Sequence, residues 1–224
     1  MFTLEPGSFL FEAWQARASL ASGVGITLLA TLVSILLATL AGLAIGVGLT
    51  YGWWWLRGLA RLYVDVMRGM PVLVLILFTY YGLALFGINV AALTAGILAL
   101  SAFAAAHVAE TLRGAVQSVP AGQTEAAKAI GLTFPKRLAY VILPQALRRM
   151  LPPWINTCLE IAKGTTLLSI IGVVDLLLAS QQVMARNYRI IDFYLLATVI
   201  YVAINLGIAQ LGAVLERRFS HLRY

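Results

Sequence analysis

Long apolar runs dominate the pattern of hydrophobic and polar positions along this chain of 224 residues. Residues 18–56 contain no Asp, Glu, Lys, Arg or His, and the same holds for residues 69–106 and 193–215. A transmembrane helix needs about 20 predominantly apolar residues, so each run is long enough to cross a bilayer. The pattern therefore predicts an all-α integral membrane protein.

The ends of the apolar runs predict five transmembrane helices in a single membrane domain over residues 1–224. The spans cover about 22–50, 64–86, 91–109, 154–174 and 193–215. A short turn at residues 86–89 separates the second span from the third. A polar loop at residues 116–150 separates the third from the fourth.

Composition supports a membrane protein. The mean hydropathy is +0.90 and 11% of residues are charged, whereas soluble domains carry about 25% charged residues. The single Cys158 excludes an internal disulfide. The first residues carry Glu5, Glu12 and Arg17 without a basic stretch, so we expect no cleavable signal peptide.

The net charge of +7 is a topology signal, because short cytoplasmic loops are rich in Lys and Arg. One set of span ends holds 12 of the 16 basic residues: Arg57, Arg61, Arg68, Arg113, Lys128, Lys136, Arg137, Arg148, Arg149, Arg217, Arg218 and Arg223. The opposite ends hold only Arg17, Arg186 and Arg189. This asymmetry predicts the amino terminus outside and the carboxy terminus inside, and it argues against a nucleic-acid surface.

The polar loop at 116–150 contains helix start and stop signals. Pro120 suits the first turn of a helix, where its missing N–H costs nothing. Residues 123–130 are good helix formers, and Gly131 is placed to end that helix in a left-handed conformation. Beside Glu125, Ala126 and Ala127 leave a small footprint that suits insertion into a groove on another protein. A solvated amphipathic helix with no partner is the alternative.

A second short helix follows in the same loop. Thr133 is placed to cap it, with Pro135 in its first turn. Pro144 and then Pro152-Pro153 predict interruptions before the fourth span.

The order Glu125-Ala126-Ala127, then Gly131, then Leu143-Pro144 resembles the cytoplasmic coupling loop of bacterial ABC importer permeases. Further stretches are similar to the polar amino-acid (histidine/glutamine-type) permeases of type I ABC importers, and the likeness runs from about residue 20 to the end. These stretches are residues 68–74, 109–123, 143–153, 168–177, 193–196 and 215–218.

The resemblance implies that Pro120, Glu125, Ala126, Ala127, Gly131, Leu143 and Pro144 couple this subunit to an ATPase. It implies a multi-pass protein of the bacterial cytoplasmic (inner) membrane that imports polar amino acids by alternating access. The implied partners are a second permease subunit, identical or paralogous, two nucleotide-binding subunits and an extracytoplasmic solute-binding protein. ATP and Mg would be bound by the ATPase subunits, with no cofactor in this chain.

Ionisable groups within the fourth span indicate a substrate pathway, because charge near a bilayer centre costs at least about 2.5–3.5 kcal/mol. Glu160 and Lys163 lie three residues apart on one helix face, beside Gly164 and the hydroxyls of Thr165 and Thr166. Together they suit a zwitterionic amino acid. An ion pair between Glu160 and Lys163 that only satisfies itself is the alternative. The family pattern has an acidic residue where Gly164 stands, which argues against Lys or Arg as the substrate if this subunit holds the site.

A second polar stripe comprises His107, Glu110 and Arg113 at the end of the third span. It predicts polar packing between helices, with a gate at the inner mouth as the alternative. Arg68 is expected to pair with Asp65 or to extend toward the interface.

The chain contains no catalytic set or metal-ligand motif, which predicts a translocation subunit without an ATPase site of its own. The alternative function is an ion-gradient-driven or passive membrane transporter or channel subunit.

Overall fold

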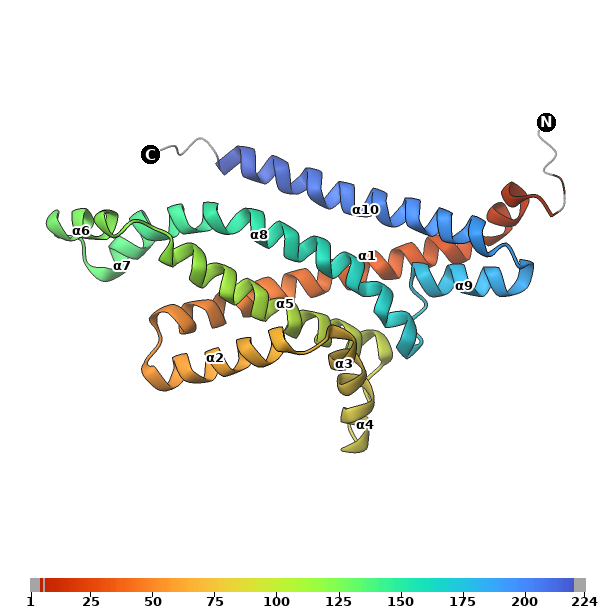
Figure 1. Cartoon of the computed structure of the whole chain (residues 1–224), viewed down its shortest axis with the longest axis horizontal. Coiled ribbons are helices and arrows are strands. Elements are labelled where there is room, and N and C mark those ends of the chain that lie inside the picture. The colour runs from red at the N-terminus through yellow and green to blue at the C-terminus, as the bar shows by residue number, and fades with distance from the viewer. Residues whose placement is uncertain (1–4, 6, 220–224) are drawn as a thin grey trace. The chain divides into compact units, whose positions relative to one another are not determined.

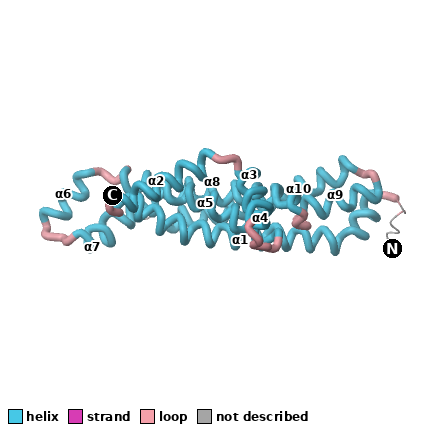
Figure 2. The backbone as a smooth tube through the Cα atoms, turned by 90° about the horizontal axis from the view of Figure 1, so that it is seen from below, coloured by secondary structure: helices cyan, strands magenta, loops and turns pink. Residues whose placement is uncertain are grey.

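The computed structural model describes Glu5 and residues 7–219, and Arg223 lies outside this part. The described residues form helices joined by short loops, without strands (Figure 1 and Figure 2). The helices are α1 (Phe9–Tyr51), α2 (Trp54–Gly69), α3 (Val72–Leu77), η1 (Phe78–Gly82), α4 (Leu83–Leu85), α5 (Ala92–Gln117), α6 (Ala121–Ala129), α7 (Phe134–Arg137), η2 (Leu138–Ile142), α8 (Leu143–Gly164), η3 (Thr165–Ile171), α9 (Leu176–Asn187) and α10 (Ile190–Phe219).

The chain forms two compact units, each built from three separate segments. Unit 1 holds the described residues up to Ser34, Val72–Leu100 and Glu160–Gly207. Unit 2 holds Ile35–Pro71, Ser101–Leu159 and the described residues from Ile208 onward. Helices α1, α5, α8 and α10 contribute residues to both units.

Three helices within the described residues are long and apolar enough to cross a membrane, namely Phe9–Tyr51, Ala92–Gln117 and Ile190–Arg218. The number rises to five if each of two bent helix pairs is counted as one span. The chain is thus an all-helical, multi-pass membrane protein.

The second span, expected as one helix over 64–86, is broken. Helix α2 ends at Gly69, Met70 adopts an extended conformation with φ −94° and ψ 133°, and α3 begins at Val72. Pro71 explains the break, because the ring of a proline disfavours helical geometry in the residue before it.

The prolines expected to interrupt the chain before the fourth span lie inside α8. Pro144 follows the π-helical turn η2, whose Leu143 N–H bonds to the Leu138 carbonyl. This widened turn carries the backbone past Pro144 without ending the helix. Pro152 and Pro153 are accommodated in the same helix, as membrane helices tolerate when neighbouring groups satisfy the freed carbonyls.

The fourth span ends differently from its expected limit at residue 174. Helix α8 tightens into the 3₁₀ helix η3, which stops at Gly172 with φ +83°. The buried Asp175 then caps α9 by accepting a 2.9 Å hydrogen bond from Leu178 N, and it accepts a second at 3.0 Å from the Tyr201 hydroxyl. Helix α9, absent from the five expected spans, is therefore held against α10 within unit 1.

Close packing of α1 on α5 organises unit 2. A Cβ added to Gly42 would lie 2.6 Å from Val108 Cβ, and one added to Gly46 would lie 2.9 Å from the Ala109 carbonyl oxygen. Only residues without a side chain permit this approach, which is the small-residue packing typical of membrane helices.

Candidate functional site: an exposed loop helix and two sets of polar groups

The loop helix α6 ends in a backbone motif that fixes the direction of the following chain. Gly131 has φ +79°, Gly131 N donates to the Lys128 carbonyl at 2.9 Å, and Leu132 N donates to the Ala127 carbonyl at 3.0 Å. These two bonds form a Schellman motif, which requires a left-handed residue at the position of Gly131. The predicted left-handed cap at Gly131 is confirmed.

The start of α6 differs slightly from expectation. Pro120 lies at the N-cap with ψ 136°, and Ala121 is the first helical residue. At the next helix Thr133 lies at the N-cap as expected, but its hydroxyl makes no capping hydrogen bond. Pro135 is in the first turn, so the fixed φ of proline supports α7 without help from Thr133.

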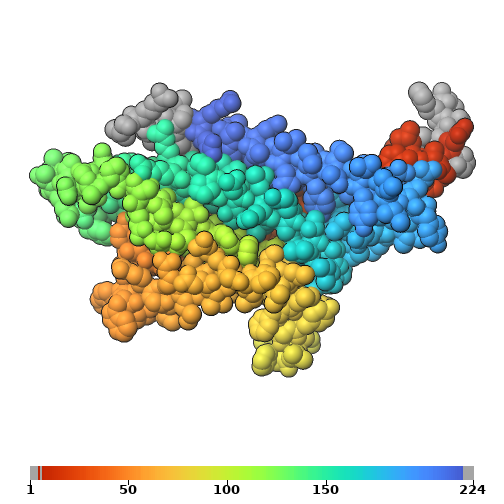
Figure 3. All heavy atoms as spheres, viewed as in Figure 1, coloured from red at the N-terminus to blue at the C-terminus, as the bar shows by residue number. Residues whose placement is uncertain are grey.

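One face of α6 is exposed and chemically mixed. Glu125 and Ala126 are exposed, whereas Ala127 is buried at 3% and anchors the helix. Ile130, the C-cap residue, follows Ala126 by one turn and is 76% exposed, so a carboxylate, a methyl group and a butyl side chain are exposed on this helix and at its end. We call Glu125, Ala126 and Ile130 the docking face. Figure 3 shows α6 and α7, in green, at the molecular surface.

The loop is fastened to both helices that enter and leave it. Gln145 of α8 donates to Gln123 of α6 at 3.4 Å, and the Arg149 guanidinium donates to the Ser118 carbonyl after α5. Leu143 and Pro144 form the first turn of α8 beside these contacts. Gln145 thus links α8 to α6, and Arg149 links α8 to the chain after α5.

Exposed apolar side chains in this loop were missed by sequence reasoning. Ile130 and Tyr140 are 76% and 75% exposed, and Phe134 is 45% exposed. The signal was available, since large apolar residues inside a polar, basic segment often mark an interface.

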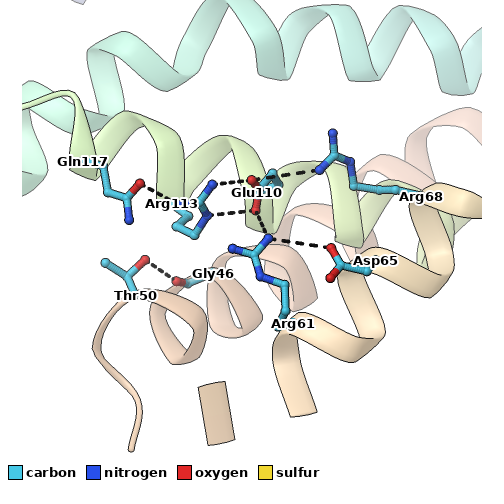
Figure 4. A network of polar contacts seen from close by, with 8 residues as sticks. All are labelled: Gly46, Thr50, Arg61, Asp65, Arg68, Glu110, Arg113 and Gln117. Atoms are coloured by element: carbon cyan, nitrogen blue, oxygen red, sulfur yellow. Dashed lines mark hydrogen bonds and ion pairs between the residues drawn. The ribbon is translucent and has the colours of Figure 1, made fainter. Parts of the chain in front are cut away.

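A charged cluster joins α2 to α5 within unit 2 (Figure 4). The Glu110 carboxylate, 20% exposed, lies 2.5 Å from Arg113 Nη2, 3.5 Å from Arg61 Nη1 and 4.0 Å from Arg68 Nη1. Arg61 also lies 3.7 Å from Asp65, one turn away. Three guanidinium groups thus converge on one carboxylate, and we call these five residues the Glu110 cluster.

The Glu110 cluster differs from the predicted stripe in two respects. His107 Nδ1 lies 3.0 Å from the Phe103 carbonyl of its own helix, and no contact joins its ring to Glu110 or Arg113 among the described residues. Arg68 contacts Glu110, while Arg61 is the partner of Asp65. Sequence spacing cannot reveal Arg61, because its contact with Glu110 is a tertiary one.

Glu160 and Lys163 are both exposed in the chain, and no ion pair joins them among the described residues. The alternative of a self-satisfied pair is therefore wrong for this structure. The Thr166 hydroxyl donates to the Lys163 carbonyl at 2.7 Å. The Glu160 carboxylate and the Lys163 ammonium are thus both exposed, and neither forms an ion pair with the other.

Two neighbours of this pair do not line an open site. Thr165 is fully buried and donates to the Ala162 carbonyl at 2.8 Å. A Cβ on Gly164 would lie 3.3 Å from Leu100 Cδ2, so the space beside this glycine is occupied by α5. We correct the expected pocket accordingly, because Thr165 and Gly164 support helix packing.

Known proteins resemble nearly the whole chain. The family model described as binding-protein-dependent transport system inner membrane component matches residues 35–221. The chain belongs to this family. The relationship confirms the resemblance drawn from the loop motif, and it makes the chain a membrane component of a transport system.

Similar proteins carry amino-acid transport names. The probable amino-acid ABC transporter permease protein YckA of Bacillus subtilis (strain 168) is 36% identical over 199 residues, covering 89% of this chain and 88% of that protein. The glutamine transport system permease protein GlnP of Escherichia coli (strain K12) is 34% identical over 211 residues, covering 93% and 96%. The octopine transport system permease protein OccM of Rhizobium radiobacter is 34% identical over 213 residues, covering 91% and 86%.

A solved structure shares the fold. The crystal structure of an amino acid ABC transporter with histidines contains a chain 33% identical to this one, with a TM-score of 0.88. The match covers 97% of this chain and 100% of that chain.

Proposed function

We propose that this chain is the permease subunit of an ATP-driven importer of polar amino acids in the bacterial cytoplasmic membrane. The observation that carries the proposal is the docking face on α6, an exposed surface fastened to α5 and α8. The names of the relatives support amino acids as the substrate class. An ion-gradient-driven transporter or channel is not favoured, because such a protein does not require a helix that docks an ATPase.

In this proposal two nucleotide-binding subunits hold ATP and Mg and act on the docking face. Glu125 offers its carboxylate to arginine or backbone N–H donors of the ATPase, where charge-assisted hydrogen bonds are strong. Ile130 supplies apolar area beside it. Closure of the ATPase pair would move α6, and the contact between Gln123 and Gln145 would pass that motion to α8, whose Arg149 binds the Ser118 carbonyl after α5.

The exposed pair Glu160 and Lys163 supports a pathway completed by a second permease subunit, identical or paralogous. Charged side chains in a span need a partner or a watery cavity, and neither residue has an ion pair within the described part of this chain. A zwitterionic amino acid offers an ammonium for Glu160 and a carboxylate for Lys163. A solute-binding protein outside the membrane would deliver it.

The decisive experiment replaces Glu125 by Lys. We expect the variant to insert normally, to lose co-purification of the ATPase in detergent and to lose vanadate-sensitive amino-acid uptake in proteoliposomes. Glu5→Lys makes the same charge change at an exposed position outside the loop and should retain both. Normal uptake by a well-inserted Glu125→Lys variant would count against the proposal.

The proposed orientation has the amino terminus outside and the loop inside. Single cysteines in a Cys158→Ser background test it, at Gly122 in α6 and at Gln182 in α9, both exposed. In right-side-out vesicles an impermeant maleimide should label position 182 and spare position 122. The reverse labelling would overturn the orientation while leaving family membership untouched.

A further inference from the structure

A groove with an almost wholly apolar lining runs between α1, α8 and α10 in unit 2. It encloses about 220 Å³ and is lined by Leu43 of α1, by Leu147, Met150, Leu151 and Trp154 of α8, and by Leu215 of α10. The remaining lining residue, Thr39, accepts a 3.0 Å hydrogen bond from Trp154 Nε1. The two polar side-chain groups of the lining, the Thr39 hydroxyl and the Trp154 indole N–H, are therefore bonded to each other.

This chemistry selects the kind of occupant. A polar solute would give up its hydration in the groove without gaining hydrogen bonds, at a cost of several kcal/mol on transfer scales. A hydrocarbon chain carries no such cost. Because the helices that form the groove are membrane helices, the lipid bilayer is the immediate source of hydrocarbon.

The packing of α10 on α8 limits the groove on one side and places Arg218 near Leu215. A Cβ on Gly212 would lie 2.7 Å from Ile155 Cδ1, so α10 lies directly against α8 at this level. Leu215 is nearly one turn further along α10 and lines the groove. Arg218 follows Leu215 by three residues, which places both on the same side of the helix.

The cations at this end outnumber the anions. Arg148 and Arg149 directly follow Leu147 in α8, and Arg217 and Arg218 follow Leu215 in α10 with Glu216 between them. Four arginines and one glutamate are therefore sequence neighbours of the residues that line the groove, and the Arg149 guanidinium is already bound to the Ser118 carbonyl. Basic clusters at the end of membrane helices attract anionic lipid headgroups.

We propose that the groove binds one acyl chain of an anionic phospholipid, whose phosphate lies beside Arg218, on the side of α10 that carries Leu215. The site depends on the place of the chain in a membrane and is independent of the solute that the transporter carries. Its occupant would bridge α1, α8 and α10 within unit 2, and α8 is the helix that begins at the coupling loop.

Fluorescence of Trp154, which lines the groove, tests the proposal. The full-length chain, with Trp14, Trp53, Trp54 and Trp55 replaced by Phe, is placed in phosphatidylcholine nanodiscs. A low mole fraction of lipid with brominated acyl chains is added, either phosphatidylglycerol or phosphatidylcholine. Bromine quenches tryptophan only at short range, so quenching reports a chain in the groove.

We expect brominated phosphatidylglycerol to quench Trp154 with an apparent affinity about fivefold or more above that of brominated phosphatidylcholine, since one arginine near an anionic lipid contributes about this factor. Arg218→Gln should reduce that ratio, whereas Arg186→Gln, an exposed arginine of unit 1, should not. Equal quenching by the two lipids would overturn the preference for an anionic headgroup.

The groove itself is tested by filling it. Leu147→Phe, and Leu43→Phe as a second variant, should weaken quenching by both brominated lipids. Leu211→Phe, at a residue 69% exposed outside the lining, serves as the matched control. Circular dichroism confirms that each variant is folded. Quenching that is insensitive to both groove-filling changes would show that the lipid is attracted only to the surface and would overturn the proposed site.

Discussion

The Arg113 guanidinium holds the Glu110 carboxylate by two hydrogen bonds, from Nε to Oε2 at 2.9 Å and from Nη2 to Oε1 at 2.5 Å. The pair lies three residues apart on α5, and Arg113 also donates to Gln117 at 2.6 Å. Both oxygens of Glu110 then face Arg61 and Arg68 of α2. Glu110 therefore offsets part of the repulsion among three guanidinium groups, and Asp65 beside Arg61 offsets another part.

Replacing Glu110 by Ala should destabilise the protein. The change removes the charged acceptor of Arg113 and leaves three guanidinium groups facing each other, and hydrogen bonds to charged groups contribute about 1.5–3 kcal/mol. We expect a lowered midpoint of thermal unfolding in detergent, with normal membrane insertion.

Arg61→Gln is the matched comparison. Arg61 lies 3.5 Å from Glu110 and its side chain is 43% exposed, so its loss should cost less than about 1 kcal/mol. A Glu110→Ala variant of unchanged thermal midpoint that leaks solute without ATP would instead favour the alternative of a gate at this position.

Gly131→Val should abolish transport while the protein still inserts. A residue with a side chain pays about 1–2 kcal/mol in the left-handed conformation, and β-branched residues adopt it least readily. The chain would leave α6 in another direction, which would misplace the docking face. Gly122→Ala, in an open position of the same helix, should transport normally. Uptake at the normal rate by a well-expressed Gly131→Val variant would contradict the role assigned to the loop.

The sequence predicts best those features whose signals are local. The left-handed turn at Gly131 follows from a single residue type, and it is present. The break after Met70 also has a local cause in Pro71, but the long apolar run around it hides the break. Pro152 and Pro153 predict an interruption that is absent, because a membrane helix tolerates prolines that would end a helix in a soluble protein.

Tertiary features escape sequence reasoning for a different physical reason. In a membrane protein both the buried and the lipid-facing sides are apolar, so hydrophobic periodicity does not distinguish them. Leu100 is 1% exposed and Leu98 is 46% exposed, yet both are leucines in one apolar run. The approach of Arg61 to Glu110 and the burial of Thr165 depend on which helix faces pack against each other. The hydrophobic pattern of the sequence does not predict that packing.

Glu160→Gln and Thr165→Val should separate transport from stability in the fourth span. Glu160 is exposed and has no ion pair among the described residues, and in the proposed function its carboxylate binds the ammonium of the substrate. Neutralising Glu160 should therefore raise the apparent KM for uptake or stop uptake, with assembly intact. Thr165→Val removes a buried hydrogen bond to Ala162 and should lower stability by about 1 kcal/mol without a change in KM. Uptake kinetics in proteoliposomes and thermal unfolding measure the two effects. An unchanged transport profile in Glu160→Gln would exclude its contact with the substrate.

Gly42→Leu should disrupt unit 2 by forcing α1 away from α5. Even the first atom of the new side chain would lie 2.6 Å from Val108 Cβ and 2.7 Å from the Ala105 carbonyl oxygen. Overpacking of this kind costs about 1–3 kcal/mol, and here a backbone oxygen is among the atoms that must move. Gly25→Leu is the control in the same helix, because nothing lies within 4 Å of its added Cβ. Thermal unfolding should show a lowered midpoint for Gly42→Leu alone. Equal midpoints for the two variants would mean that the close approach of α1 to α5 does not stabilise the protein in the membrane.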